Sequence, residues 1–222
     1  MPELKILALR LDTTLSEWEL PLFRGAVVNL LPNKDVVYHN HEKNGLRYAY
    51  PLIQYRCINS KATILGVGEG VDSISALLSI PSFDVHIGNR YETMKIEKVD
   101  ADVHQVQMTK EPVSYRLNDW VPLNEKNYTR FMATDSLAER ILQLERILTG
   151  NILSMLKGVG IFIDFPLHIT LSNILHQHTL RYKNMMLQGI DIEFKANISL
   201  PDYIGLGKHA SVGFGTLTRV IK

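Results

Sequence analysis

Residues 201–215 read PDYIGLGKHASVGFG and are the most informative stretch of this sequence. Four glycines stand there in two pairs, and one bulky apolar residue splits each pair: Gly205 and Gly207, then Gly213 and Gly215. Glycine allows positive φ and lets another backbone approach closely. Successive backbone N–H groups can form a concave anion site, to which Lys208 and His209 would add side-chain donors. The stretch therefore indicates either a loop for a phosphate backbone or a glycine-containing hairpin that only connects two strands, and its spacing disfavours a dinucleotide-binding loop.

Upstream of this stretch, the first half of the chain alternates strand and helix patterns. Leu4 to Leu11 is dense in aliphatic residues, as a buried strand is, and Pro21 can begin a helix that Pro32 stops. The further predicted elements are strands at 50–58 and 61–67 around an Asn59–Ser60 turn, a short helix with Val71, Ile74, Leu77 and Leu78 on one face, and strands at 84–88 and within 94–108. The order strand, helix, strand, strand, helix, strand is the ferredoxin-like arrangement.

The second half of the chain reads as an eroded version of the first. A strand is predicted at 113–121, followed by a helix that starts with Ser136 and Glu139 as a capping box and that Gly158 can end. Its apolar face has three- and four-residue steps: Leu137, Ile141, Leu144, Leu148, Ile152 and Met155. Strands are predicted at 167–175, 185–200 and 211–221, without a second helix. We therefore expect an α+β protein of two ferredoxin-like (RRM-like) domains in tandem, 1–110 and 111–222, with a glycine-rich loop near the C-terminus.

Composition limits the classes of function. The chain has 222 residues, of which 45% are hydrophobic and 21% charged, enough for a folded core. Its 24 basic and 23 acidic residues nearly cancel, so any site for a polyanion depends on local clustering. The single cysteine, Cys57, excludes an internal disulfide and fits a reducing compartment. Charged residues interrupt the first apolar run and no apolar stretch is long enough to span a bilayer, so we expect a soluble, cytoplasmic protein with no membrane partner.

The glycine-rich stretch also resembles a known family. A C-terminal Gly-x-Gly, a short basic part, Ser211 and Gly-Phe-Gly are similar to the signature loop of the RAMP superfamily of CRISPR-associated proteins, above all the repeat-RNA endoribonuclease of the Cas-six type. Segments of the first half resemble the N-terminal domain of bacterial members: Phe23-Arg24-Gly25, His39-Asn40-His41, Tyr50 to Tyr55 and Ala62 to Gly70. The resemblance implies that CRISPR repeat RNA, as a single strand or a hairpin, is bound by Gly205, Gly207, Lys208, His209, Ser211, Gly213, Gly215 and Arg47.

The resemblance places the catalytic histidine in the polar segment YHNHEKNGLRY at 38–48. RNA can be cut without metal when its 2′-hydroxyl attacks the adjacent phosphate, provided that a general base, a general acid and a cation assist. Histidine can serve as acid or base near neutral pH. His41 is favoured for its nearness to Lys43, and His39 is the alternative. Lys43 or Arg47 would supply the cation, and Tyr48 or Tyr50 a hydrogen bond or a stacking ring. From the residues alone, both histidines could equally be ordinary polar loop residues.

The remaining histidines carry weaker signals. His176 and His178 are predicted to end one strand and start the next, exposed to solvent, and His168 to be a partly buried strand residue. Residues two apart can share a strand face, but no nearby cysteine and no partnered cluster of acidic residues completes a zinc set with either histidine pair. We therefore expect no metal site, and no cofactor.

Three functions stay open at this point. The leading one is a metal-independent endoribonuclease that processes CRISPR precursor RNA within its repeats, as a homodimer or with other CRISPR proteins. The alternative is a non-catalytic RNA-binding RAMP subunit of a CRISPR interference complex, which would keep the glycine loop but need no acid–base histidine. The third is a ferredoxin-like protein that dimerises or binds a small molecule, an interpretation that the near-neutral charge favours.

Overall fold

The computed structural model describes residues 2–30, 41–42, 45–46 and 50–221 and, within these ranges, all side chains except those of residues 41, 42, 45, 46, 125 and 126. The chain forms two compact units. The N-terminal unit comprises residues 3–104 and the tripeptide 211–213. The C-terminal unit comprises residues 105–210 and 214–222, together with the first two residues.

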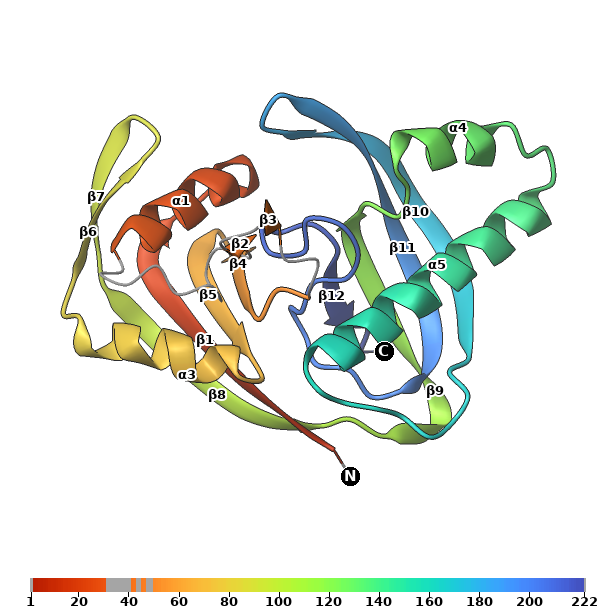
Figure 1. The fold of residues 1–222 in the computed structure, drawn as a ribbon, viewed down its shortest axis with the longest axis horizontal. Coiled ribbons are helices and arrows are strands. Elements are labelled where there is room, and N and C mark those ends of the chain that lie inside the picture. The colour runs from red at the N-terminus through yellow and green to blue at the C-terminus, as the bar shows by residue number, and fades with distance from the viewer. Residues whose placement is uncertain (1, 31–40, 43–44, 47–49, 222) are drawn as a thin grey trace. The chain divides into compact units, whose positions relative to one another are not determined.

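A four-stranded sheet forms the centre of the N-terminal unit (Figure 1). Its order is β4-β5-β1-β8, from the strands β1 (Glu3–Thr14), β4 (Ile53–Ile58), β5 (Lys61–Val67) and β8 (Ile96–Gln105). The helix α1 (Leu20–Leu30) follows β1 after the 3-10 turn η1 (Glu17–Glu19), and α3 (Gly70–Ser75) with the 3-10 turn η2 (Ala76–Ser79) follows β5. Strand, helix, strand, strand, helix, strand is the order predicted from the sequence, and the ferredoxin-like arrangement of this unit is confirmed.

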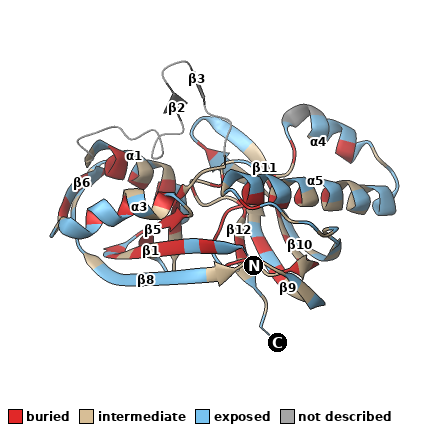
Figure 2. Cartoon of the chain, turned by 60° about the horizontal axis from the view of Figure 1, so that its bottom comes forward, coloured by how far each residue is buried: buried red, intermediate tan, exposed pale blue. Residues whose placement is uncertain are grey.

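Local sequence explains the hairpin of β4 and β5. Ile58 and Lys61 are the last paired residues, which leaves Asn59 and Ser60 as a two-residue turn. Both have positive φ, 51° and 61°, as a type I′ turn requires. β5 is buried along nearly its whole length, whereas β8, at the edge of the sheet, is mostly exposed (Figure 2).

The core of the N-terminal unit joins the sheet to its helices. Phe23 of α1 is fully buried, and its ring meets that of Tyr55 edge-on at 5.7 Å. Ile74 and Leu77 are also fully buried, as their spacing predicts. The prediction for Leu78 is wrong: its side chain is 46% exposed, because α3 tightens into η2 and the shorter turn rotates this residue outward.

One further hairpin covers α1. β6 (Phe83–Ile87) and β7 (Arg90–Met94) pair antiparallel, and β6 packs against α1 with Phe83, Val85 and Ile87 buried. β6 was expected from its alternating pattern, but β7 was not, because its residues RYETM are mostly polar. Two very short strands, β2 (His41–Glu42) and β3 (Gly45–Leu46), pair with each other.

The C-terminal unit has a sheet of the same kind. Its order is β10-β11-β9-β12, from the strands β9 (Met108–Trp120), β10 (Ile169–Tyr182), β11 (Met185–Ile198) and β12 (Thr216–Arg219). Numbered by their place along each unit, the four strands of both sheets stand in the order two, three, one, four. In the C-terminal unit, residues 199–215 lead from β11 to β12 at the place of the second helix, so the glycine-rich stretch replaces that helix. The predicted eroded repeat has this structural basis.

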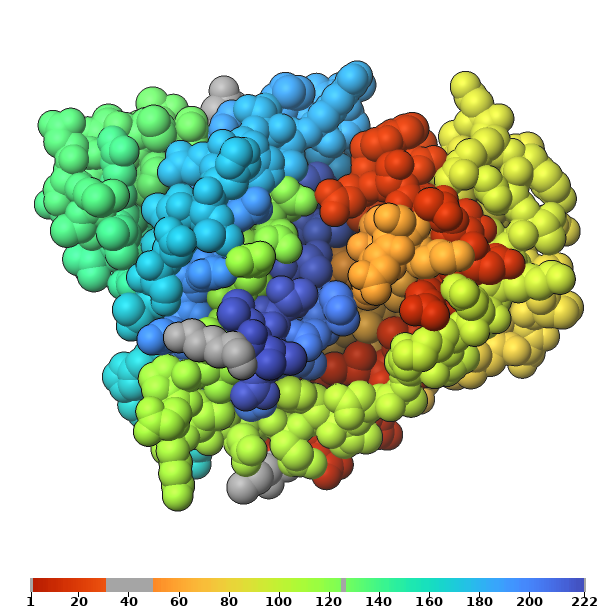
Figure 3. All heavy atoms as spheres, turned by 180° about the vertical axis from the view of Figure 1, so that it is seen from behind, coloured from red at the N-terminus to blue at the C-terminus, as the bar shows by residue number. Residues whose placement is uncertain are grey.

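Two helices connect β9 to β10. α5 (Leu137–Gly158) begins and ends where predicted: the Ser136 hydroxyl accepts from the Glu139 N–H at 3.3 Å, and Leu144 and Leu148 are buried. α5 packs on β10, whose outer residues lie on the surface in the view from behind (Figure 3). α4 (Glu125–Met132) was not predicted, since it carries few apolar residues. Among the described helices, none combines the length and the apolar character that crossing a bilayer would require.

Candidate functional site

Backbone hydrogen bonds join the two ends of the glycine-rich segment, residues 205–215. The Leu206 N–H donates to the Gly215 carbonyl oxygen at 2.8 Å, and Gly205 forms an antiparallel bridge with Thr216. The Gly215 N–H donates in turn to the carbonyl oxygen of Asp119 at 3.0 Å, which attaches the segment to the end of β9. We call the pair of Leu206 and Gly215 the neck of the segment.

The protein itself occupies the space that the glycines leave open. A Cβ at Gly215 would lie 1.9 Å from the carbonyl oxygen of Leu206, and one at Gly207 would lie 2.8 Å from the indole nitrogen of Trp120. That nitrogen donates to the side-chain oxygen of Asn151 on α5 at 2.9 Å. Gly207 and Gly215 have φ of 88° and 62°, in the left-handed region that favours glycine. The close approach allowed by these two glycines is therefore used within the C-terminal unit, while Lys208 between them is exposed.

Three rings pack together beside the neck. Tyr182, the last residue of β10, lies with its ring centroid 4.4 Å from that of His209 and 5.7 Å from that of Phe214. Burial lowers the pKa of His209, and the neighbouring charges of Lys208 and Lys183 lower it further. His209 is therefore a neutral donor or acceptor at neutral pH rather than a cation. The nearby positive charges come from the two lysines.

The tripeptide 211–213 belongs to the N-terminal unit. Val212 forms a parallel bridge with Tyr55, and the Tyr55 N–H donates to the carbonyl oxygen of Ser211 at 2.8 Å. The Ser211 hydroxyl accepts from the Arg24 guanidinium at 3.4 Å. Sequence reasoning quoted Arg24 as part of a resemblance but gave it no role, and the structure places it next to a predicted RNA-binding residue.

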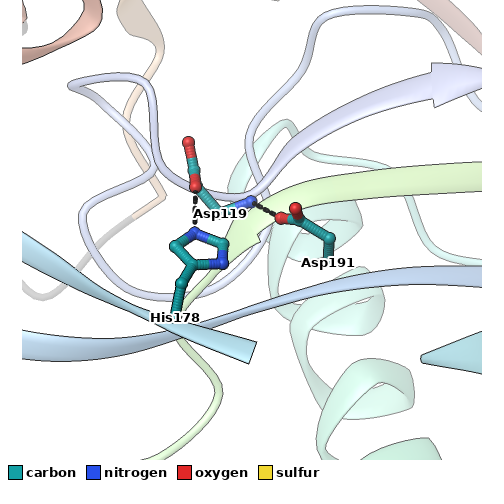
Figure 4. Close-up of side chains that lie close together, drawn as sticks. All are labelled: Asp119, His178 and Asp191. Carbon is teal, nitrogen blue, oxygen red and sulfur yellow. Dashed lines mark hydrogen bonds and ion pairs between the residues drawn. The ribbon is translucent and has the colours of Figure 1, made fainter. Parts of the chain in front are cut away.

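A group of two aspartates and a histidine lies where β9, β10 and β11 meet (Figure 4). His178 Nε2 is 2.6 Å from Asp119 Oδ1, and the Asp119 N–H donates to Asp191 Oδ1 at 2.7 Å. One ligand atom from each of the three residues lies within 4.8 Å of the others, so each could contribute to a metal ion. Sequence reasoning missed this group because its members stand far apart in the chain and only the sheet register brings them together.

The structure corrects the interpretations of three histidines. His176 and His178 both lie inside β10 instead of at a strand junction, and the His178 side chain is only 23% exposed. β10 extends to Tyr182, beyond the predicted end at residue 175. It is an edge strand with many exposed polar residues, so the sequence lacks the apolar pattern that would have predicted the strand there. His168 precedes β10 and is exposed, and its backbone N–H donates to the Asn197 side chain at 2.8 Å.

The predicted catalytic residues fall on the least described part of the chain. The backbone of His41 lies in β2, where it pairs with Leu46 of β3. His39, Lys43, Arg47 and Tyr48 lie outside the described residues. Their roles stay predictions.

Comparison with known proteins covers both units. Residues 2–105 match the family model of the Cas6b N-terminal domain, and residues 107–220 match that of the Cas6b C-terminal domain. The chain belongs to the Cas6b family. The resemblance to CRISPR endoribonucleases of the Cas-six type, noted in the glycine-rich stretch, is thereby confirmed.

Solved structures agree with this assignment to Cas6b. One described as Cas6b is 28% identical with a TM-score of 0.88, and covers 99% of this chain and 100% of its own. Another, described as the CRISPR RNA processing endoribonuclease Cas6b, is 26% identical with a TM-score of 0.74 and the same coverage. Thermus thermophilus Cas6, 11% identical with a TM-score of 0.57 and covering 99% of this chain and all of its own, shares the fold. An uncharacterized protein of Methanocaldococcus jannaschii is 36% identical over 107 residues, 47% of this chain and 69% of that protein.

Proposed function

We propose that this Cas6b chain is an endoribonuclease that cuts CRISPR precursor RNA within its repeats and needs no metal ion for the cut. The observation that carries the proposal is the match to Cas6b over both units, together with full-length similarity to a structure described as a CRISPR RNA processing endoribonuclease. The substrate class comes from that description and from the family.

The proposed chemistry uses the RNA's own 2′-hydroxyl as nucleophile. A general base removes its proton, the oxygen attacks the adjacent phosphorus, and a general acid protonates the departing 5′-oxygen. We assign the acid–base role to His41, with His39 as the alternative. Lys43, two residues from His41 in the sequence, would stabilise the extra charge at phosphorus, and Tyr48 would donate a hydrogen bond. The pairing of β2 with β3 supports the choice of His41, because it gives this residue a defined backbone environment.

The glycine-rich segment is the proposed RNA-binding element. Lys208 is exposed and offers a cation to a phosphate, and His209, Ser211 and Arg47 would add hydrogen bonds. Gly205, Gly207, Gly213 and Gly215 contribute through the path that they impose on the backbone. Gly213 has a positive φ of 96°, which larger residues rarely adopt, and a Cβ added there would lie 2.4 Å from the Leu20 side chain. Both observations disfavour any larger residue at this position.

The test is cleavage of a repeat RNA from the same genome by purified protein in excess chelator. Cleavage at one position, lost in His41→Ala or His39→Ala with RNA binding retained, would support the proposal. Strict dependence on added magnesium or manganese would contradict the metal-independent mechanism. Tight binding of repeat RNA without any cleavage would instead indicate the non-catalytic RAMP subunit.

A further inference from the structure

We propose that His178 and Asp191 are positioning residues, which hold Asp119 so that its carbonyl oxygen fixes the neck of the glycine-rich segment and thereby sets the affinity for RNA. This inference rests on the proposed function, because it assumes that the segment binds RNA. All the contacts that support it lie within the C-terminal unit.

Asp119 stands at an irregularity of β9. Trp120 pairs with Ile190 and Leu117 with Ile192, so two residues of β9, Asn118 and Asp119, face the single residue Asp191 of β11. This is a β-bulge, a feature that re-aims side chains and backbone groups. Asp119 has φ of 52°, in the left-handed region, which aspartate adopts more readily than most residues other than glycine when local hydrogen bonds hold it.

Each polar group of Asp119 contacts a different part of the unit. Its N–H donates to Asp191 of β11, its carboxylate bonds His178 of β10, and its carbonyl oxygen accepts the N–H of Gly215. An ionised carboxylate can only accept hydrogen bonds, so Nε2 of His178 carries the proton in this pair. Nδ1 of His178 is buried and has no hydrogen-bond partner among the described residues, so the ring is oriented by its bond to Asp119 and by its packing against the His176 ring, 5.3 Å away. Two side chains thus hold this one residue from two strands.

Close backbone contacts at the neck couple the position of Asp119 to that of the segment. Gly215 bonds Leu206 as well as Asp119, and the α-carbon of Gly215 lies so close to Leu206 that even a methyl group would collide. A shift of Asp119 must therefore move the neck and the residues next to it, Lys208 among them. Further along β10, Tyr182 packs on His209 and Phe214, so the same strand contacts the segment at a second point.

A divalent cation is the competing interpretation of the same three side chains. The bonds favour positioning, because an oxygen of Asp191 is engaged by the Asp119 N–H, and an oxygen of Asp119 by the His178 ring. A cation that used Nε2 of His178 and Oδ1 of Asp119 as ligands would have to displace the 2.6 Å bond between these two atoms. The two interpretations make different predictions for binding and for stability.

The experiment compares His178→Ala and Asp191→Ala with the conservative His178→Gln and Asp191→Asn, which keep a donor and an acceptor. Affinity is measured by fluorescence anisotropy with a repeat RNA that carries a 2′-deoxy substitution at the cut. The cleavage rate is measured with the unmodified RNA by single-turnover kinetics at saturating protein. We expect the Kd of the alanine variants to rise about 5- to 150-fold, the usual range of coupling between sites. The saturated cleavage rate should stay within about twofold of wild type, and the conservative variants should recover most of the affinity.

Unchanged Kd in folded alanine variants would overturn the proposal, and so would a fall in the saturated rate without a change in Kd. If the alanine variants fail to fold, Asp119→Asn decides: asparagine tolerates the positive φ and keeps both backbone bonds, so the weaker hydrogen bond of its uncharged amide to His178 should still raise Kd. Stabilisation of wild type but not of His178→Ala by zinc or manganese, with equal Kd for RNA, would establish a cation site and overturn positioning. Failure of the wild-type protein to bind repeat RNA would refute the proposed function itself and is seen before any variant is measured.

Discussion

Replacing Gly215 by alanine should destabilise the C-terminal unit well beyond the cost of its backbone conformation. The new Cβ would lie 1.9 Å from the carbonyl oxygen of Leu206. The backbone of Leu206 is itself bonded to Gly215 at 2.8 Å, so the collision cannot be relieved without opening the neck. The bond from the Gly215 N–H to Asp119 would be strained by the same movement.

The expected magnitude follows from these terms. The left-handed conformation costs alanine about 1–2 kcal/mol, and a lost backbone hydrogen bond about 0.5–1.5 kcal/mol. The free energy of unfolding should therefore fall by about 3 kcal/mol if both bonds at the neck are weakened. At roughly 2–4 °C per kcal/mol for a chain of this size, Tm should fall by about 6–12 °C.

Two other glycines provide matched controls. Gly160 has φ of 75°, but no atom lies within 4 Å of the place that a methyl group would take there, so Gly160→Ala should show only the conformational cost, about 1–2 kcal/mol. Gly150 lies inside α5 with equally open space, and Gly150→Ala should raise the stability by about 0.5–1 kcal/mol. Alanine at the three positions therefore separates collision, backbone conformation and helix propensity.

Tryptophan fluorescence provides the assay. Trp120 is fully buried beside Gly207, whereas Trp18 is 71% exposed and can be replaced by phenylalanine at little cost, so Trp120 alone then reports on the unfolding of its unit. Thermal unfolding is followed in this background for each alanine variant. A loss of stability in Gly215→Ala no greater than that in Gly160→Ala would refute the packing described at the neck.

Three further outcomes are expected. Alanine at the catalytic histidine, His41 or else His39, should slow cleavage about 10²- to 10⁴-fold and spare RNA binding, and wild-type rates in both single variants would remove this assignment. Lys208→Gln should weaken RNA binding and lower the slope of log K against log salt by about one, as the loss of one phosphate contact does; an unchanged slope would exclude Lys208 from the phosphate contacts. The pKa of His209 is lowered in the folded state, so the unfolded chain binds the proton first as the pH falls, and the free energy of unfolding should decrease below about pH 6.5. His209→Asn, which tolerates the positive φ, should lessen this decrease, as measured by urea titrations at several pH values.

The sequence predicted what local chemistry specifies. The Asn59–Ser60 turn, the Ser136 cap of α5 and the apolar steps of that helix from Leu144 to Met155 are signals contained in a few neighbouring residues, and the structure has them. The prediction for Leu137 is wrong, since this residue of the first turn is 64% exposed. The lack of a second helix in the C-terminal unit was also predicted, but the strand predicted at 211–221 is confined to β12, because the glycine-rich segment extends to Gly215. α4 escaped prediction because it is mostly polar, although Asn124, whose side chain accepts from the Asn127 N–H at 2.8 Å, is a typical cap.

Long-range geometry could not be predicted in this way. The contact of His178 with Asp119 depends on the bulge in β9 and on the pairing of β9, β10 and β11, none of which a local pattern encodes. The same holds for the glycines: their spacing indicated close approach, but the atoms that approach, Leu206 and Trp120, come from the fold. The polar segment that carries His39 and His41 has no apolar period, and its chemical role was inferred from resemblance alone.

The most direct test of the proposed mechanism is a single 2′-deoxy substitution in the repeat RNA, just upstream of the cut, assayed in excess chelator. The mechanism predicts that this RNA binds nearly as tightly as the unmodified one, since most contacts go to phosphates and bases, but is not cut. The unmodified RNA should yield a 2′,3′-cyclic phosphate, or its opened form, and a 5′-hydroxyl, identified by mass spectrometry. Cleavage of the deoxy-substituted RNA at the wild-type rate would contradict the account, because the nucleophile could not then be the 2′-hydroxyl.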